Sequence, residues 1–140
     1  MKLSISEIIN TAAKKKLKTD KVAFLQSNDS KPLRMILRLM YDKDIEFLLP
    51  STPPPWKKND YVGVEGMLYK ETRRLRIFIK GGGYDNLNQT KRESLFISLL
   101  EDIDNKDAEL LCKIIARDTV TGLTRKTVED AFPTLMTERF

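Results

Sequence analysis

The chain has 140 residues, of which 41% are hydrophobic and 32% charged, a composition typical of one globular domain and not of a disordered or fibrous protein. It contains no histidine and one cysteine, which excludes histidine-based zinc sites, Ser-His-Asp and Cys-His catalysis, cysteine-rich metal sites and an internal disulfide. No apolar run approaches the roughly 18 residues of a membrane span, and the N-terminal basic cluster follows the apolar part, opposite to a secretory signal, so we expect a cytoplasmic protein.

Charge is distributed unevenly along the chain. Residues 1–92 carry 19 Lys and Arg against 10 Asp and Glu, whereas residues 93–140 carry 6 against 10. The net charge of +5 therefore divides into +9 and −4. This asymmetry suits a molecule with one basic face for a polyanion, and a solvated surface of mixed charge is the alternative.

Two short helices are predicted near the N-terminus. Ser6 is expected to cap a first helix that runs from Glu7 toward Lys18, because serine favours the N-cap position and apolar residues follow at helical spacing. The lysines near its end suit the negative end of the helix dipole. A second helix is expected over residues 19–26, followed by a polar loop at residues 27–30.

The third predicted helix has the clearest pattern in the chain. Apolar side chains recur at helical spacing between Leu33 and Leu48, so one face of this helix is expected to lie on the core, with Ser30 as its cap. Residues 50–56 contain four prolines and form an extended connection. We expect this connection to wrap the core and bury Trp56; recognition by a proline-reading domain is the alternative.

Residues 61–80 fit two patterns. Leu75, Ile77 and Ile79 alternate as in a strand, whereas other apolar residues of the segment fit a helical stripe. Three glycines at residues 81–83 end the element in either case. The residues alone leave both structures open.

Three more helices are predicted in the remainder of the chain. Apolar stripes cover residues 95–103 and 108–115, with a turn and cap at residues 104–107. Thr124 is the expected cap of a last helix that stops near Pro133.

Candidate catalytic groups are few. Cys112 lies in an apolar stripe and is expected to be a buried small hydrophobe; the alternative, a reactive thiol, has no histidine to activate it. Glycosidases and two-metal nucleases need carboxylates that converge in a cleft, whereas the acidic clusters here are expected to be solvated at helix ends. The clusters are Asp42, Asp44 and Glu46, and Glu101, Asp102 and Asp104. We therefore expect a non-catalytic protein with no metal and no cofactor.

The triple glycine lies among basic residues. It lacks the surrounding pattern of a phosphate loop, so a helix stop with a tight turn is the plain interpretation. The exposed amides of Gly81 and Gly82, beside Lys80, are nevertheless candidate contacts to a phosphate backbone. Lys91 and Arg92 are candidates for the same role.

Residues 116–133 predict a helix end, a loop with one glycine and the capped start of another helix. Gly122 would let the backbone approach a partner closely. The free N–H groups after Thr124, with Arg125 and Lys126, form an expected anion site. A plain turn with a good cap is the alternative.

Three blocks of residues, with the spacing between them, match a known family. They are Arg117-Asp118 with Gly122 and Phe132-Pro133-Thr134-Leu135; the leucine-rich stretch of residues 33–49 with Tyr41-Asp42, Phe47 and Pro50; and Asp107-Ala108-Glu109-Leu110-Leu111. This pattern resembles the N-terminal DNA-binding domain of phage-type ATP-dependent DNA ligases, over nearly the whole chain. The resemblance implies an all-α fold, helix over residues 61–80 and duplex DNA as partner. Arg117 is a further candidate contact, and a pair with Asp118 or a nearby acid is the alternative for its side chain. The ligase motif Lys-x-Asp-Gly is absent, and the block Leu-Thr-Gly-Asn is replaced around residues 86–89.

A second set of blocks is similar to small proteins of T-even-like tailed phages, a family that brings no established function. The matching residues are Pro54-Pro55-Trp56-Lys57, Arg73-Arg74-Leu75, Lys80-Gly81-Gly82, Lys91-Arg92-Glu93-Ser94-Leu95-Phe96-Ile97 and Gly122-Leu123-Thr124. For a phage protein, the expected location is the host cytoplasm.

The sequence thus predicts an all-α, compact single-domain helical bundle over residues 1–140, with a possible small β element within residues 61–80. The expected function is sequence-independent binding of duplex DNA through phosphates. A module that docks on a phage or host replication or transcription protein, and a minor virion component, are the alternatives. No membrane partner is expected. The candidate DNA contacts are Arg117, Gly122, Thr124, Arg125, Lys126, Lys80, Gly81, Gly82, Lys91 and Arg92.

Because the ligase lysine motif is absent, we expect no adenylation by ATP and no nick sealing. Incubation of the purified chain with labelled ATP tests this expectation. A covalent adduct on a lysine would contradict it.

Overall fold

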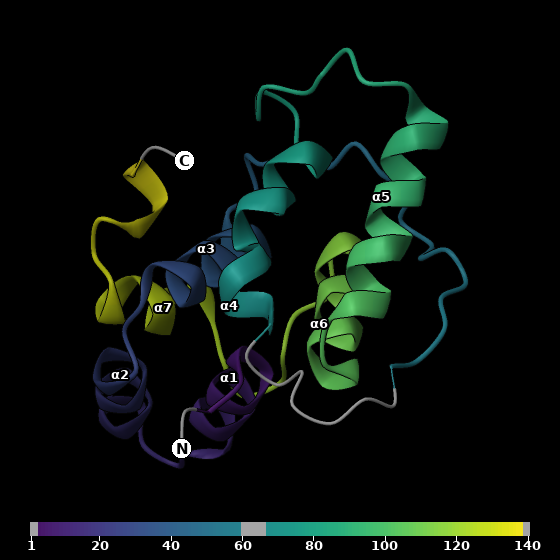
Figure 1. Cartoon of the computed structure of the whole chain (residues 1–140). Coiled ribbons are helices and arrows are strands. Elements are labelled where there is room, and N and C mark those ends of the chain that lie inside the picture. The colour runs from purple at the N-terminus through teal and green to yellow at the C-terminus, as the bar shows by residue number, and fades with distance from the viewer. Residues whose placement is uncertain (1–2, 60–66, 139–140) are drawn as a thin grey trace.

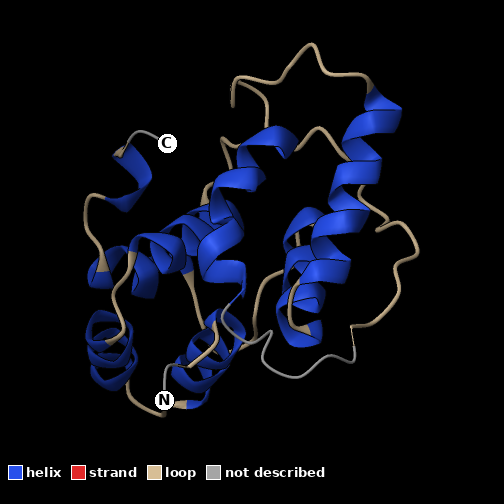
Figure 2. Ribbon diagram, in the orientation of Figure 1, coloured by secondary structure: helices blue, strands red, loops and turns tan. Residues whose placement is uncertain are grey.

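Helices make up the regular structure of residues 3–59 and 67–138, the part of the chain that this computed structural model describes (Figures 1 and 2). The all-α prediction is confirmed for these residues, which contain no strand. The α-helices are α1 (Ile5–Lys14), α2 (Lys18–Ser27), α3 (Lys31–Tyr41), α4 (Met67–Glu71), α5 (Gln89–Asp102), α6 (Asn105–Ile115) and α7 (Arg125–Ala131), and the 3-10 helices are η1 (Thr72–Phe78) and η2 (Leu135–Thr137).

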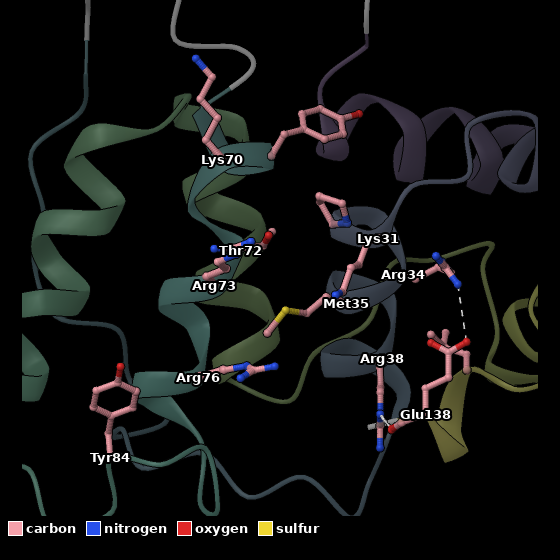
Figure 3. A pocket seen from close by; sticks show the side chains of 13 residues that line it. Lys31, Arg34, Met35, Arg38, Lys70, Thr72, Arg73, Arg76, Tyr84 and Glu138 are labelled. Carbon is pink, nitrogen blue, oxygen red and sulfur yellow. Dashed lines mark hydrogen bonds and ion pairs between the residues drawn. The ribbon is translucent and has the colours of Figure 1, made fainter. Parts of the chain in front are cut away.

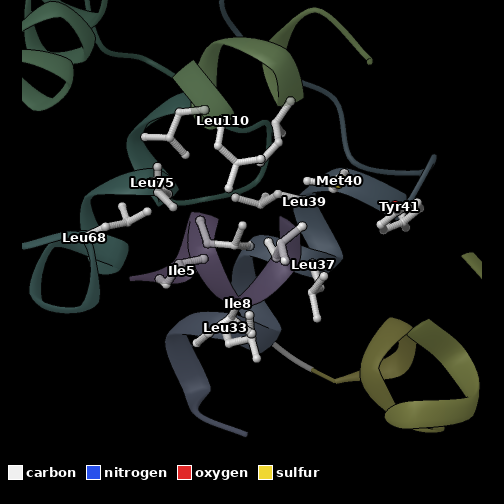
Figure 4. Close-up of a cluster of buried hydrophobic side chains, with 14 of the residues drawn as sticks. Ile5, Ile8, Leu33, Leu37, Leu39, Met40, Tyr41, Leu68, Leu75 and Leu110 are labelled. Carbon is white, nitrogen blue, oxygen red and sulfur yellow. The ribbon is translucent and has the colours of Figure 1, made fainter. Parts of the chain in front are cut away.

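The helices pack around one apolar core. Helix α3 packs against α4, η1 and η2; α1 packs against α2 and α6; α2 packs against α7, and α5 against α6 and η1 (Figure 1). Figure 4 shows buried side chains of α1, α3, α4, η1 and α6 meeting in this core. Fully burying one Leu or Ile side chain stabilises the fold by roughly 1.5–3 kcal/mol relative to exposure, so these contacts dominate the packing of the elements.

Helix α1 begins two residues before its predicted start. Ser4, not Ser6, is the N-cap: its Oγ accepts from the Glu7 N–H at 3.2 Å, and the Glu7 carboxylate accepts from the Ser4 N–H at 3.2 Å. Ser6 is buried in the first turn, where its N–H donates to Asp107 Oδ1 at 2.9 Å. The helix also ends at Lys14, earlier than predicted, whereas the second helix lies as predicted.

Helix α3 has the predicted cap but ends sooner than its apolar stripe. Ser30 Oγ accepts from the Leu33 N–H at 3.2 Å. After Tyr41, the Asp42 carboxylate accepts from the Asp44 N–H at 3.0 Å, which turns the chain out of the helix. The prediction that Asp42 is solvated is therefore wrong: its side chain is buried.

The proline-rich connection, predicted to wrap the core, leads into residues bonded to α5 and α6. The Lys57 N–H donates to Glu101 Oε2 and the Asn59 N–H donates to Asn105 Oδ1, both at 2.7 Å. Trp56 packs against the core and is half-buried. The wrap is thus confirmed, although the tryptophan is less buried than expected.

Residues 67–78 are helical, as the family resemblance implies, in the two short pieces α4 and η1. Residues 61–66 of the predicted segment lie outside the described residues. The alternative β element is reduced to one isolated antiparallel bridge between Phe47 and Ile79. The expected turn and cap at residues 104–107 is confirmed only in part: Asp104 is the cap, but residues 105–107 already belong to α6. The predicted cap Thr124 begins α7, and Cys112 is half-buried on α6.

Asp107 joins α1 to α6, but its burial disfavours the charged carboxylate. Its side chain is fully buried; Oδ1 accepts from the Ser6 N–H, whereas Oδ2 has no hydrogen-bond partner in the described structure. Burial is the largest influence on this carboxyl group and raises its pKa from 3.8 to about 6. The charged form of Asp107 is therefore disfavoured in the folded state.

We expect the free energy of unfolding to fall as pH rises from about 4 to about 6, because in this window the folded state holds the Asp107 proton more tightly than the unfolded state does. Asp107→Asn keeps an acceptor for the Ser6 N–H without the charge. The free energy of unfolding of this variant should exceed that of the wild type by up to about 3 kcal/mol near neutral pH, and the difference should shrink toward about pH 4. Urea denaturation across this pH range measures both.

Glu109→Gln is the matched control, because Glu109 is an exposed acid on the same helix. Its exposed ion pair with Lys106, at 3.8 Å, contributes little to the free energy of unfolding. A wild type that gains stability relative to Asp107→Asn as pH rises through this window would contradict the account.

Candidate nucleic-acid interface

Six basic side chains line a groove between α3 and the α4–η1 segment (Figure 3). The groove encloses about 660 Å³, and Glu138 is the acid among its described lining residues. Every one of the six cations comes from the first 92 residues, which carry the positive excess. They are Lys31, Arg34 and Arg38 on α3, and Lys70, Arg73 and Arg76 on α4 and η1.

The 3-10 geometry of η1 directs its arginines into the groove. With three residues per turn, residues three apart lie in one row along the helix. One row is buried and packs into the core; it consists of Thr72, Leu75 and Phe78. Arg73 and Arg76 form a second, exposed row, which Lys70 continues one turn earlier. Figure 3 shows these three cations on the same wall of the groove.

The third row of η1 faces away from the groove toward α5. Arg74 pairs there with Glu71 at 3.2 Å and with Asp102 at 3.6 Å. Because the three rows have different neighbours, the Arg73–Arg76 row is the one that brings exposed cations of η1 to the groove, and Thr72 of the buried row lies beside it in the lining.

Two of the six cations hold the C-terminal segment in place. Arg38 pairs with Asp42 at 3.2 Å and donates to the Glu138 and Met136 carbonyl oxygens. Arg34 pairs with Asp29 at 3.0 Å and with the Glu138 carboxylate at 3.5 Å. These two arginines therefore position one edge of the groove.

The other four cations are exposed, and none makes an ion pair or a side-chain hydrogen bond within the described ranges. They are Lys31, Lys70, Arg73 and Arg76. An exposed cation without a protein partner can bind an anion without first breaking a pair. The groove therefore presents a concentrated positive charge to solvent.

The structure gives the predicted contact Arg117 a role within the fold. It occupies the left-handed position after α6, with φ 63°, and the N–H groups of Arg117 and Asp118 donate to carbonyls of the last turn at 3.0 and 2.9 Å. Its guanidinium lies 4.6 Å from the Phe47 ring centroid and donates to the Ile45 carbonyl. Arg117 thus ties the segment after α3 to the end of α6.

The loop before α7 is also explained by internal contacts. Gly122 has φ 95°, and a Cβ there would lie 2.4 Å from the Ala13 carbonyl oxygen, so the close approach this glycine allows is to α1. Lys21 donates to the carbonyls of both residues. At the helix start, Thr124 Oγ1 accepts from the Thr127 N–H at 3.3 Å.

The two basic residues that begin α7 are paired with acids of the same helix. Arg125 Nε lies 2.5 Å from Glu129 Oε1, and Lys126 Nζ lies 3.3 Å from Asp130 Oδ1. Lys18 also pairs with Asp130, at 2.5 Å, and together the two lysines hold the pKa of this carboxyl group below its usual range. The positive charge expected at this helix start is largely cancelled.

Arg92, a predicted phosphate contact, is buried, with 3% of its surface exposed, so it is not accessible to a phosphate backbone. Its guanidinium donates to the carbonyls of Ile77 at 3.1 Å and Tyr84 at 2.7 Å, and to Gln89 Oε1 at 2.6 Å. Arg92 therefore holds the loop between η1 and α5. Lys91, beside it, is exposed.

The glycine loop is likewise held by internal contacts. The Gly81 N–H donates to the Asp85 carboxylate at 2.9 and 3.0 Å, and a Cβ on Gly82 would lie 2.1 Å from the Arg76 carbonyl oxygen. Lys80 pairs with Glu46 at 3.6 Å. This loop and α7 lie at separate ends of the molecule (Figure 1), so the two groups of predicted contacts do not form one site.

Reasoning from the sequence missed the four unpaired cations of the groove. A signal was present, because Lys70, Arg73 and Arg76 are spaced by three residues. That spacing indicates one face only in a 3-10 helix, whereas it drifts around an α-helix of 3.6 residues per turn.

A family model matches residues 8–120, which include every cation of the groove. The chain belongs to DUF6433, a family of unknown function. No curated protein and no solved structure matches it. Within the described part of this DUF6433 chain, no helix is long and apolar enough to cross a membrane, and no three His, Cys, Asp or Glu side chains gather as a metal site would require.

The contact between Gly122 and α1 predicts unequal costs for two glycine substitutions. Gly83 has nearly the same backbone angle, φ 99° against 95°, but open space around it. Gly83→Ala should cost roughly 1–2 kcal/mol for the left-handed backbone alone. Gly122→Ala should cost more, because its Cβ would also meet the Ala13 carbonyl oxygen at 2.4 Å. Urea denaturation of both variants compares them, and equal losses would show that the close approach to α1 contributes nothing.

Proposed function

We propose that this DUF6433 protein is a non-catalytic module that binds nucleic acid through phosphates, and that the groove between α3 and η1 is its contact surface. The observation that carries the proposal is the set of four exposed, unpaired cations in that groove, Lys31, Lys70, Arg73 and Arg76. Duplex DNA is the partner that the ligase resemblance implies. For a phage protein, the site of action would be the host cytoplasm.

Electrostatics favours the groove over the start of α7. Arg125 and Lys126 must leave Glu129 and Asp130 before they can contact a phosphate, and these acids would then repel it. The groove cations break no such pair. Arginine also offers a planar pair of donors that matches phosphate oxygens, which supports Arg73 and Arg76 as the principal contacts.

The composition of the groove supports binding without sequence preference. Base reading commonly uses Asn and Gln as well as Arg, and no Asn or Gln lies among the described lining residues. Contacts to phosphate fix position but carry no sequence information. We therefore expect dissociation constants of roughly 10⁻⁴ to 10⁻⁶ M near physiological salt, with a strong dependence on ionic strength.

Two buried or half-buried side chains outside the groove, Cys112 and Asp42, support a non-catalytic role. Burial raises the pKa of the Cys112 thiol, which disfavours the nucleophilic thiolate. Asp42, the most buried member of the acidic clusters, is engaged with Arg38 and the Asp44 N–H. Neither group is arranged as a nucleophile or a general acid.

Two matched double variants test which surface binds DNA. Arg73→Ala/Arg76→Ala and Arg125→Ala/Lys126→Ala each remove two positive charges, one pair from the groove and one from α7. Affinity for a duplex is measured by fluorescence anisotropy over a range of salt concentrations. The groove variant should flatten the slope of log affinity against log salt by about 1.8, since each lost phosphate contact contributes about 0.9. The α7 variant should stay near the wild-type slope.

All four substituted side chains are exposed, so both variants should keep their helices. Circular dichroism checks this. A larger loss in the α7 variant would move the interface to the site expected from sequence. No binding by the wild type at low salt, with protein near 100 μM, about the weak end of the expected range, would reject DNA and favour docking on a protein.

A further inference from the structure

An exposed aromatic ring lies in the groove beside the cations. Tyr84 lines the groove, and 49% of its surface is exposed. Figure 3 shows its ring on the same wall as Arg73 and Arg76, at the end of their row. Helix α3 adds two apolar side chains to the lining of the groove, Pro32 and Met35. A phosphate-binding surface alone would need neither the ring nor these apolar side chains.

The loop that carries Tyr84 is held firmly although the ring itself is exposed. The Tyr84 carbonyl accepts from the buried Arg92 guanidinium at 2.7 Å and from the Leu87 N–H at 3.0 Å. Arg92 also binds the Ile77 carbonyl at the end of η1, so one buried side chain links the ring's loop to the row of arginines. Asp85 closes the other side of the loop by accepting from the Gly81 N–H. The backbone that carries the ring is therefore held in place beside the row of arginines.

The size of the groove restricts what can enter it. Its volume of about 660 Å³ lies within the roughly 300–1,000 Å³ of small-ligand pockets, large enough for a nucleotide but far too small for a double helix. A duplex would lie across the rim with its bases stacked inside, out of reach of Tyr84. An unpaired nucleotide exposes both its base and its phosphates.

We propose that the groove takes unpaired nucleotides, with a base stacked on Tyr84 and neighbouring phosphates bound by Arg73 and Arg76. Successive members of that row are about 6 Å apart along the 3-10 axis, which suits contacts to consecutive phosphates of one strand. Stacking on an aromatic face tolerates every base, so this arrangement keeps the absence of sequence preference. The inference rests on the proposed function and names the form of nucleic acid that the same site prefers.

The test compares three labelled probes of equal length by anisotropy: an oligothymidylate strand, the same strand made of abasic sites, and a blunt duplex. The wild type should bind oligothymidylate more tightly than either other probe. Tyr84→Ala should weaken oligothymidylate binding by about 5- to 160-fold, the range that corresponds to loss of one base–aromatic stack. Its binding of the abasic strand and the duplex should stay within about twofold of wild type.

Two further variants separate stacking from loop structure. Tyr84→Phe keeps the aromatic face and should retain the preference for oligothymidylate, whereas Tyr84→Leu keeps bulk without the face and should lose it. Equal binding of oligothymidylate and duplex by the wild type, or an unchanged preference in Tyr84→Ala, would overturn the inference. Duplex binding that is still weakened by Arg73→Ala/Arg76→Ala would then leave the proposed function standing. Failure of all three probes to bind would overturn both.

Discussion

Leu75 and Phe78 enter the core from one edge of η1, and the Phe78 ring meets the Phe96 ring of α5 edge-on with centroids 5.2 Å apart. Because η1 is a 3-10 helix, burying this edge determines where its other two edges face. One turns Arg74 toward acids of α4 and α5, and the other turns Arg73 and Arg76 into the groove. The direction of the basic row is thus a consequence of apolar packing, and the groove exists only while η1 keeps its three-residue period.

The groove differs from the start of α7 in the pairing of its basic residues. At α7, Arg125 pairs with Glu129 and Lys126 pairs with Asp130, both within one helix. In the groove, four exposed cations line one cavity without such pairs, an arrangement that costs folding free energy through like-charge repulsion. Bound phosphates would relieve that repulsion, which is the physical basis for proposing an anionic partner. Glu138 offsets part of it by pairing with Arg34 at 3.5 Å.

Local signals predicted much of the fold. The caps Ser30 and Thr124 precede apolar stripes and each begins a helix as expected, and Asp104 begins α6 within the expected turn and cap at residues 104–107. The end of α3 was not predictable from its stripe, because Ile45 is buried on a turn beyond the helix and continues the same periodicity. The true cap of α1 was predictable from local sequence, because Ser4 and Glu7 have the spacing of a capping box, whereas the residue three positions after Ser6 is Ile9.

The candidate site was harder to predict, for reasons that individual residues make clear. Arg92 lies in a basic dipeptide typical of a surface, but it is buried because its guanidinium binds carbonyls of η1 and of the loop that precedes α5. Pairing within α7 could have been anticipated, since Arg125 and Glu129, four residues apart, lie on one helix face. Predicting the groove would have required two features that composition does not reveal: the 3-10 period of η1 and the packing of η1 beside α3.

Amide chemical shifts, followed by NMR as a short duplex with an unpaired overhang is added, test the central claim most directly. The account predicts that shifts concentrate on residues 31–38 of α3, on residues 70–76 and on Tyr84, and that they diminish as salt is raised. Shifts concentrated on α7 and the loop at residues 117–124, or no shifts at low salt, would contradict it.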